Sequence, residues 1–575
     1  MSRFLKRHLI QALCLTIIFA DGGTDATVAK VDSTIALART LIDSNYTVGS
    51  FTLLKRAIKK ADRTKAPLDI TALKKDIALL EPKEIPYDIT ININGDPTTS
   101  LGFGWFTNAN CSGGSVQIVE GNIISRAGFA TPTSIIAAQS IPVLNLNYNV
   151  ARNKLDSLAD IPVNTKKNFT SNKALATGLK PSTRYSFRVG KDGAWSEIGH
   201  FTTASSGKTP FSFIYFTDPQ ANTDDMFNIS QKTLHAATKM FPSANFILSC
   251  GDLIESSGEN NSEWEYEQFF KTQQDIWLNT PFAPVIGNHD KSTNKNFTAH
   301  FNTPVTCFDQ SMSTTPGSVY SYVWGDALFI AFSTEDYSTP GYLDSLKSWI
   351  STQAALHPTS KWKIAYYHKT IYTGSVSHQS DTDGKVIRDS LAPLFDSLHI
   401  DLAFQGHDHI YEVIGPVKNK MLVAGAVSNQ ITTTADTRSN VTGKLGGIFD
   451  VTNGTLYFLN NSAGKKKYEP RLKDQMDAIE KNIGMSNYFS LFNGRFGQTG
   501  EPTFSYVTVS TDSIKISTYT VDETGTATLF DAFSIIKSSQ GAGLIDPRAA
   551  PFAHDICLVC TNRNLQFRGT GKMEQ

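Results

Sequence analysis

The sequence predicts a multi-domain chain in which a small three-helix module and a β-sandwich precede an α/β domain. Its 575 residues are more than one hydrophobic core usually holds, so several domains are expected. Residues 84–205 contain short segments of alternating hydrophobicity separated by turns, which is typical of a β-sandwich. Over residues 208–537, apolar strand-like runs alternate with helical patterns, and this alternation predicts an α/β domain.

The N-terminal segment, residues 1–29, has the pattern of an export signal. Arg3, Lys6 and Arg7 provide a positive start, and Leu9–Ala20 is an apolar run of signal length, too short to span a membrane. No internal stretch is long and apolar enough to be a membrane span. We therefore expect a secreted, periplasmic or extracellular protein.

Residues 30–83 contain three apolar stripes at helical spacing, and each stripe predicts a short helix. The segment Leu41-Ile-Asp-Ser-Asn-Tyr-Thr, followed by Leu53-Leu-Lys-Arg-Ala-Ile, resembles the three-helix FIVAR modules of extracellular proteins. That resemblance implies a cell-surface or glycan contact. A helical spacer without any ligand is the alternative.

The predicted β-sandwich carries one further signature. Leu179-Lys-Pro-Ser-Thr-Arg-Tyr185 resembles the fibronectin type III motif, in which a tyrosine near a strand start bonds back to the chain. The expected role of this domain is that of a scaffold, because nothing in it suggests chemistry. A linker, 204–210, follows it.

The α/β domain is predicted from six apolar strands with helical patterns between several of them. The strands are Phe211–Thr217, Phe246–Cys250, Phe282–Ile286, Ala327–Phe332, Trp362–Tyr367 and Leu402–Gln405. Helices are expected at Ile229–Met240 and Trp264–Trp277, and a β segment at Phe504–Ile536 ends the domain. Residues 538–575 have no useful periodicity and are expected to form a flexible tail.

Metal-competent side chains follow five of these strands, each at the strand's carboxyl end. They lie in Asp218-Pro-Gln220, Gly251-Asp252, Gly287-Asn-His-Asp290, the lone His368 and Gly406-His-Asp-His409. Ligands usually collect at the carboxyl ends of strands in such sheets. A mixture of imidazole and oxygen donors suits iron, zinc or manganese. Two such metals roughly 3.5–4 Å apart can clamp a phosphoryl group and convert a bound water into hydroxide.

In this order, the five motifs resemble the calcineurin-like metallophosphoesterase superfamily, and with the sandwich in front they resemble its purple acid phosphatase branch. The resemblance implies a mixed β-sandwich flanked by helices and a dinuclear centre of iron, zinc or manganese. Asp218 and His409 would hold the first metal, and Asp252 would bridge both. The second metal would be held by Asn288, His368 and His407.

The resemblance also implies three residues that act on the substrate. His289 would contact the phosphate or protonate the leaving group, and Asp290 could orient it. His378 lies ten residues after His368, where purple acid phosphatases have the second of two histidines that face the substrate. Ser377 takes the place of the first, so a surface loop histidine is the alternative for His378.

Two positions depart from the purple acid phosphatase pattern. Glu255 stands where those enzymes have the tyrosine that binds ferric iron and gives the colour, so a colourless enzyme is expected. Gln220 stands where many members of the superfamily have a metal-binding histidine. Its amide oxygen could ligate weakly or could hold a metal-bound water.

These features predict a secreted dimetal phosphoesterase, acid-phosphatase-like, that hydrolyses small phosphate monoesters by metal-bound hydroxide. Phosphodiester or nucleotide hydrolysis on the same site is one alternative. An adhesion or carbohydrate-binding protein with a degenerate enzyme domain is another. The formal net charge is zero, which argues against nucleic acid as the main partner. A serine hydrolase is not supported, because no Gly-x-Ser-x-Gly elbow follows a strand.

Overall fold

The computed structural model describes most of the chain between residues 85 and 538. The described residues are 35, 38–39, 48–64, 73, 85–109, 111, 113–148, 165–256, 262–291, 296–312, 314–378, 382–432, 441, 444–471, 475, 485, 488–492 and 495–538. The predicted export signal and, apart from Ser538, the predicted C-terminal tail lie outside them. Of the predicted three-helix module, the structure describes the helix α3 (Val48–Thr64) and a few single residues.

Two sheets form the centre of the α/β region. The first contains, in spatial order, β19 (Val427–Ser428), β22 (Ile448–Asp450), β27 (Ala527–Ile536), β26 (Ser513–Val521), β25 (Thr503–Val509), β10 (Phe211–Phe216), β11 (Phe246–Ser249) and β12 (Phe282–Pro284). The second contains β13 (Tyr320–Trp324), β14 (Ala327–Ala331), β15 (Trp362–Tyr366), β16 (Leu402–Phe404), β23 (Thr455–Asn460), β17 (Tyr411–Lys418) and β18 (Met421–Leu422), with β24 (Phe496–Gly497) beside β17. The six predicted strands are all present.

The two sheets pack face to face over one hydrophobic core. Phe213 and Phe246 of the first sheet stack at 4.9 Å between ring centroids, and Phe329 of the second sheet meets both edge-on. All side chains of β10 and β11 are buried, because helices cover the opposite face of the sheet. This explains why these strands read as continuous apolar runs rather than as alternating ones.

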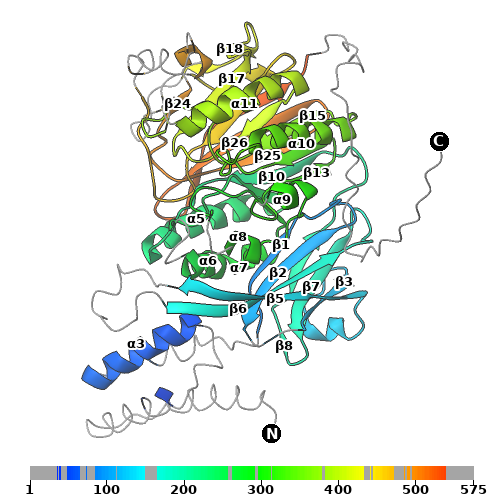
Figure 1. Ribbon diagram of the computed structural model, residues 1–575, viewed down its shortest axis with the longest axis vertical. Coiled ribbons are helices and arrows are strands. Elements are labelled where there is room, and N and C mark those ends of the chain that lie inside the picture. Colours follow the sequence, from blue (N-terminus) through cyan, green and yellow to red (C-terminus); the bar gives the residue numbers. More distant parts are fainter. Residues whose placement is uncertain are drawn as a thin grey trace, which may run out of the picture.

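Helices cover the outer faces of both sheets (Figure 1). The first sheet is covered by α5 (Asp224–Met240), α6 (Ser262–Lys271), α7 (Gln274–Trp277) and α8 (Asn296–His300). The second is covered by α9 (Cys307–Met312), α10 (Tyr342–Leu356) and α11 (Thr382–Leu398). The helix predicted at 264–277 is two helices, because the chain leaves helical geometry at Gln273, where φ is −138° and ψ is 23°. The described part contains no helix that is both long and apolar enough to cross a membrane.

The N-terminal β region consists of two packed sheets. One is β1 (Tyr87–Asn92), β2 (Leu101–Asn108), β6 (Thr165–Ala176) and β5 (Gln139–Tyr148). The other is β4 (Ser134–Ala137), β3 (Ser115–Glu120), β7 (Arg184–Lys191), β8 (Ala194–Trp195) and β9 (Gly199–Thr202). The hydroxyl of Tyr185 accepts a hydrogen bond from the Lys180 backbone N–H at 2.9 Å, the bond that the Leu179–Tyr185 motif predicts.

The N-terminal β region and the α/β region share a sheet. β1 pairs in parallel with β12 through Asn92 and Phe282, so β1, β2, β6 and β5 extend the first sheet of the α/β region. The sequence predicts a separate sandwich followed by a linker, whereas the structure has one continuous sheet that runs through both regions (Figure 1). The helices α6, α7 and α8 lie beside this junction.

Candidate metal centre

The five predicted motif loops meet at one place. β10, β11 and β12 are parallel neighbours, as are β14, β15 and β16, so the loops after them leave each sheet at the same edge. Hydrogen bonds join the two sheets there. The backbone N–H of His407 donates to both carboxylate oxygens of Asp218, at 3.0 and 3.1 Å. The metal-competent side chains of two sheets are therefore neighbours in space.

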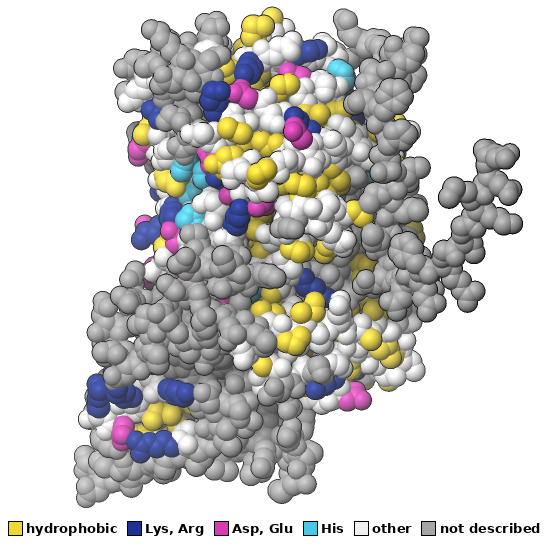
Figure 2. Space-filling model, viewed as in Figure 1, with side chains coloured by type: hydrophobic (Ala, Val, Ile, Leu, Met, Phe, Trp, Pro, Cys, Tyr) yellow, Lys and Arg dark blue, Asp and Glu magenta, His cyan; other side chains and the backbone are white. Residues whose placement is uncertain are grey.

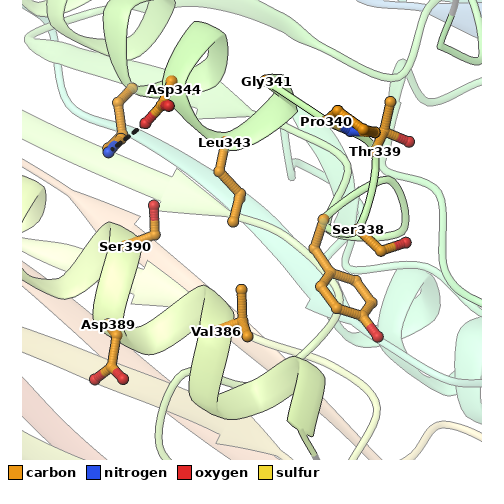
Figure 3. Close-up of a pocket in the computed structure, with 11 residues that line it drawn as sticks. Ser338, Thr339, Pro340, Gly341, Leu343, Asp344, Val386, Asp389 and Ser390 are labelled. Carbon is orange, nitrogen blue, oxygen red and sulfur yellow. Dashed lines mark ion pairs between the residues drawn. The ribbon is translucent and has the colours of Figure 1, made fainter.

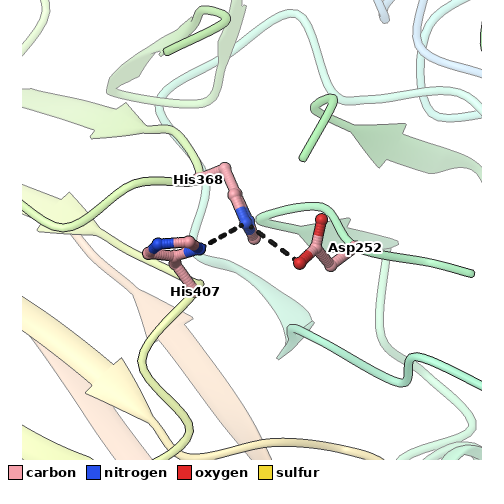
Figure 4. A group of neighbouring side chains, drawn as sticks. All are labelled: Asp252, His368 and His407. Atoms are coloured by element: carbon pink, nitrogen blue, oxygen red, sulfur yellow. Dashed lines mark hydrogen bonds and ion pairs between the residues drawn. The ribbon is translucent and has the colours of Figure 1, made fainter. Parts of the chain in front are cut away.

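Asp252, His368 and His407 (Figure 4) form the first half of the site together with Asn288. His368 Nε2 lies 2.9 Å from Asn288 Oδ1, 3.2 Å from Asp252 Oδ2 and 3.2 Å from His407 Nδ1. All of these atoms can present lone pairs to the same point, as ligands of one metal ion do. The structure thus brings together the three predicted ligands of the second metal with the predicted bridging carboxylate.

The ring of His368 is held in the orientation that a metal ligand needs. Its Nδ1–H donates to the Cys250 carbonyl oxygen at 2.8 Å, which leaves the Nε2 lone pair directed at the cluster. Burial alone would lower the pKa of His368, but the neighbouring Asp252 carboxylate raises it to about 10. The surroundings therefore favour a positive charge at the point where Nε2 faces the other donors.

Asp218 and His409 form the second half of the site. Both side chains are buried, and His409 Nε2 lies 3.3 Å from Asp218 Oδ1. Within the part of the chain that the structure describes, neither ring nitrogen of His409 has a hydrogen-bond partner. A buried imidazole whose ring nitrogens make no hydrogen bond carries a desolvation cost that a bound cation would remove. These residues therefore fit the first metal position.

Gln220 contacts the predicted bridging carboxylate. Its Nε2 donates to Asp252 Oδ2 at 2.7 Å, and its buried Oε1 has no hydrogen-bond partner among the described residues. The amide thus both orients Asp252 and presents a free oxygen inside the site. The geometry is compatible with either role that the sequence leaves open for this residue.

Four of the predicted ligands adopt a backbone conformation that is uncommon for residues other than glycine. The φ angles of Asp218, Gln220, Asp252 and His407 are 53°, 27°, 51° and 73°. Such conformations cost of order 1–3 kcal/mol each and cluster at functional sites. Their concentration here is a structural signal of function that is independent of side-chain chemistry.

Two glycines allow the loops to approach this closely. A Cβ atom on Gly406 would lie 2.6 Å from Thr217 Oγ1 and 2.9 Å from His368 Nδ1. A Cβ atom on Gly287 would lie 2.1 Å from Asp252 Oδ1. The close backbone approach excludes any side chain at these positions.

His289 lies at the edge of the site, and its position corrects one prediction. Its Nδ1–H donates to the Glu255 carbonyl oxygen, while its Nε2 lies 4.0 Å from Asp252 Oδ2. Asp290 does not orient His289. The Asp290 carboxylate instead accepts hydrogen bonds from the backbone N–H groups of Leu253 and Gly287 and from the hydroxyl of Tyr266. Asp290 therefore ties two ligand loops together.

His378 lies beside the site, together with an aromatic residue that the sequence reasoning missed. The rings of His378 and His407 are 4.0 Å apart between centroids. Tyr468 stacks on His409 at 4.5 Å and meets His378 edge-on at 5.4 Å. No motif contains Tyr468, and its place in the site becomes visible only because the segment after β23 folds back over the ligands.

Lys466 is a second residue that the sequence reasoning missed. Lys465-Lys-Lys467 reads as a solvated turn, but Lys466 Nζ pairs with Glu255 Oε1 at 2.6 Å. The two tyrosines nearest in sequence to Glu255 are engaged elsewhere: Tyr266 donates to Asp290, and the Tyr215 hydroxyl donates to the Gln405 carbonyl. The described residues thus place an acid–lysine pair at the motif position that carries a tyrosine in purple acid phosphatases.

Comparison with known proteins identifies two domains in the chain. Residues 86–203 match the model of the purple acid phosphatase N-terminal domain, and residues 211–411 match the model of the calcineurin-like phosphoesterases. The chain therefore contains a calcineurin-like phosphoesterase domain, preceded by a domain of the purple acid phosphatase N-terminal type. The matched region contains the five ligand loops, so the predicted fold class and family resemblance are confirmed.

Individual relatives agree with these two domain matches. The chain is 24% identical over 289 residues to acid phosphatase type 7 of Mus musculus, covering 47% of this chain and 62% of that protein. It is 23% identical over 364 residues to purple acid phosphatase 15 of Arabidopsis thaliana, covering 58% of this chain and 65% of that protein. The chain thus spans about three fifths of the length of these relatives.

A solved structure shares the fold. The purple acid phosphatase PPD1 from yellow lupin seeds matches with a TM-score of 0.55 and 14% sequence identity, covering 79% of this chain and 75% of that one. The N-terminal β region and the calcineurin-like phosphoesterase domain therefore follow one another as they do in that fold.

Two surface features can be described on this part of the chain. Histidine and charged side chains gather on the face drawn in Figure 2 at mid-height. A pocket of about 570 Å³ lies between the beginning of α10 and α11 (Figure 3). Leu343, Asp344, Val386 and Asp389 are among its lining residues, and none of the predicted metal ligands lines it. This pocket is therefore not part of the candidate metal centre.

Proposed function

We propose that this chain is an exported dimetal phosphoesterase that hydrolyses small phosphate monoesters, as an acid phosphatase does. The observation that carries the proposal is the donor set gathered at the strand ends. Asp218, Asp252 and His409 would hold one ion of iron, zinc or manganese. Asn288, His368 and His407 would hold the other, with Asp252 shared and Gln220 as an additional ligand or an orienting group. The buried ring nitrogens of His409 and the free oxygen of Gln220 support this assignment.

Two bound metal ions would supply a water nucleophile activated near neutral pH and a clamp for the phosphoryl oxygens. The protein's own residues fix the geometry of that centre. Gln220 holds Asp252 from one side, and the backbone N–H of His289 holds it from the other, at 2.7 and 2.8 Å. The bridging carboxylate is thus oriented by two hydrogen bonds.

Proton transfer to the leaving group would come from a histidine. The side chain of His289 is 22% exposed, so substrate can reach it, and its Nδ1 is fixed by the Glu255 carbonyl. Nε2 is then the nitrogen that would contact the phosphate or protonate the leaving oxygen. His378 is the other candidate, because its ring packs on the predicted ligand His407.

The first experiment compares p-nitrophenyl phosphate with its bis ester on the full chain, reloaded separately with zinc, manganese and iron. The proposal predicts a kcat/KM at least about tenfold higher for the monoester, a difference of about 1.4 kcal/mol. A higher value for the diester would favour phosphodiester or nucleotide hydrolysis on the same metals.

The second experiment replaces the bridging carboxylate. Asp252→Asn should lower kcat by on the order of 10³-fold, about 4 kcal/mol, because the shared anionic ligand is lost. His235→Gln, on the outer helix α5, is the matched control and should keep full activity. Full hydrolysis by Asp252→Asn would reject the mechanism. Glycan binding without any turnover would instead support an adhesion protein with a degenerate enzyme domain.

Export and surface contacts belong to the same proposal. The order of charged and apolar residues at 1–29 supports secretion, and the resemblance of residues 30–83 to FIVAR modules supports a cell-surface or glycan contact. N-terminal sequencing of protein recovered from the medium or periplasm tests the first point. A mature chain that starts within residues 21–30 is expected.

A further inference from the structure

A second cluster of metal-competent side chains lies at the junction of the N-terminal β region and the phosphoesterase domain. It consists of Asp88 on β1, Glu263 at the beginning of α6 and His300 at the end of α8. The exposed fractions of these residues are 3%, 1% and 1%, so the cluster is sealed from solvent. None of the three belongs to the motifs that form the catalytic centre.

The cluster offers one imidazole and two carboxylates at metal-binding distances. One ligand atom from each residue lies within 4.8 Å of the other two. His300 Nε2 is 3.3 Å from Glu263 Oε2, which also accepts a hydrogen bond from Asn296 Nδ2 at 2.6 Å. Among the described residues, the buried His300 Nδ1 has no hydrogen-bond partner. Nε2 is the ring nitrogen that faces the Glu263 carboxylate, so it is the nitrogen that a cation held by this cluster would bind.

The ring of His300 is fixed by aromatic neighbours from both sides of the junction. Its ring stacks on Phe106 of β2 at 4.3 Å, on Tyr266 of α6 at 4.7 Å and on Phe270 of α6 at 5.0 Å. Metal sites require ligands whose rotamers are locked by their surroundings. The aromatic stack restricts the side-chain conformation of His300 in this way.

Asp88 has a positive φ angle, as do four of the predicted ligands of the catalytic centre. Its φ is 49°, and the pairing of β1 with β2 is irregular between Tyr87 and Thr90. A left-handed residue inside a strand is strained unless the surroundings hold it in place. A ligand role for the Asp88 carboxyl would account for this strain.

The donor types also suit a cation, because the buried cluster combines two carboxylates with one imidazole. Buried charges persist when they are paired or coordinate metals, because desolvation of an isolated ion is costly. A divalent ion would neutralise both carboxylates and leave His300 neutral, as a metal ligand must be.

We propose that Asp88, Glu263 and His300 bind a divalent transition-metal ion such as Zn²⁺, separate from the catalytic pair. This ion would link β1 of the N-terminal region to α6 and α8 and so stabilise the junction between the two regions. A connection to the catalytic centre also exists: Tyr266, which stacks on His300, donates to the Asp290 carboxylate that ties two ligand loops together.

The test measures bound zinc rather than turnover. Full-length protein is stripped with a chelator, dialysed against Zn²⁺ and analysed for zinc per chain. The variants Asp88→Asn and His300→Phe should each bind one zinc fewer than the wild type. Asn tolerates the left-handed conformation at residue 88, and Phe preserves the aromatic stack at residue 300. Glu197→Gln, an exposed change in the same region, is the matched control and should bind as much zinc as the wild type.

A second measurement separates this site from the catalytic centre. In the Asp252→Asn background, Zn²⁺ should still raise the melting temperature, and adding Asp88→Asn should make that rise smaller. Equal zinc content in the wild type and both variants would overturn the proposal. If neither variant folds, zinc anomalous scattering from wild-type crystals decides: a peak between the three side chains is expected, and its absence at saturating zinc would reject the site.

Discussion

Lys466 Nζ lies 2.6 Å from Glu255 Oε1, and the two half-buried side chains form an ion pair at the edge of the metal centre. The carbonyl oxygen of the same Glu255 accepts the hydrogen bond from His289 Nδ1. The pair therefore stabilises the loop that holds a predicted substrate-facing histidine. It also connects the motif region to the segment after β23, which contributes Tyr468 to the site.

The first prediction concerns this ion pair. Lys466→Met should lower kcat/KM for p-nitrophenyl phosphate about tenfold, a loss of about 1.4 kcal/mol, because the loop that anchors His289 loses its partner. The metal content should stay unchanged, since no predicted ligand is altered. Lys465→Met, an exposed neighbour, is the control and should behave as the wild type. Loss of metal in Lys466→Met would show that the pair supports the ligands instead.

The second prediction concerns colour. The active, metal-loaded protein should lack an intense visible absorption band, because Glu255 replaces the iron-binding tyrosine and Tyr266 and Tyr215 are engaged elsewhere. The ring of Tyr468 stacks on a predicted ligand, His409, so Tyr468 is the tyrosine to test for iron binding. An absorption spectrum of iron-loaded protein checks the prediction. A strong band that disappears in Tyr468→Phe would contradict it and identify Tyr468 as the tyrosinate.

The third prediction separates two roles for Gln220. Gln220→Leu removes both the hydrogen bond to Asp252 and the free Oε1. If Gln220 orients the bridging carboxylate, metal affinity should fall about 10–100-fold while the number of bound ions at saturation stays the same. Titration of metal-depleted protein with zinc gives both quantities. A loss of one bound ion at saturation would mean that Gln220 is an indispensable ligand.

The fourth prediction uses the close packing around Gly406. Gly406→Ala should weaken metal binding at least about tenfold, because the added Cβ would meet Thr217 and the His368 ring at under 3 Å. Gly207→Ala is the matched control, since a Cβ there meets one atom at 3.9 Å and φ is not in the left-handed region. Equal metal affinity in both variants would show that the loop can relax.

The fifth prediction concerns the pH dependence of stability. Burial raises the pKa of Asp401 from its ordinary 3.8 to about 6, although Lys537 at 2.8 Å opposes the shift. The folded state therefore binds this proton more tightly than the unfolded state. Its contribution to stability is full below about pH 4 and falls as the pH rises to about 6. The loss is at most about 3 kcal/mol, since one pKa unit corresponds to about 1.4 kcal/mol.

Asp401→Asn removes this titration, so the stability of the variant relative to the wild type should increase between pH 4 and 6 and then level off. Melting temperatures of both proteins across this range provide the measurement. A difference that stays constant with pH would contradict the raised pKa.

Much of the phosphoesterase domain could be predicted from the sequence, because its buried strands are short and apolar and end directly at the ligand motifs. The boundaries proposed at residues 29, 83, 205 and 537, and the roles of the individual site residues, stay predictions. The contact expected between Asp290 and His289 is not formed, because the Asp290 carboxylate is bonded elsewhere. Sequence adjacency to His289 suggested a contact, whereas the turn directs the carboxylate towards Leu253 and Gly287.

The sequence by itself determined the chemistry of the candidate site: which donors follow which strands, and that a glutamate replaces the colour-giving tyrosine. Only the tertiary structure decided which distant residues join those donors. Lys466, Tyr468 and the Asp88–Glu263–His300 cluster belong to no local motif. Local patterns encode strands and turns, but contacts between segments hundreds of residues apart depend on how the sheets and helices pack together.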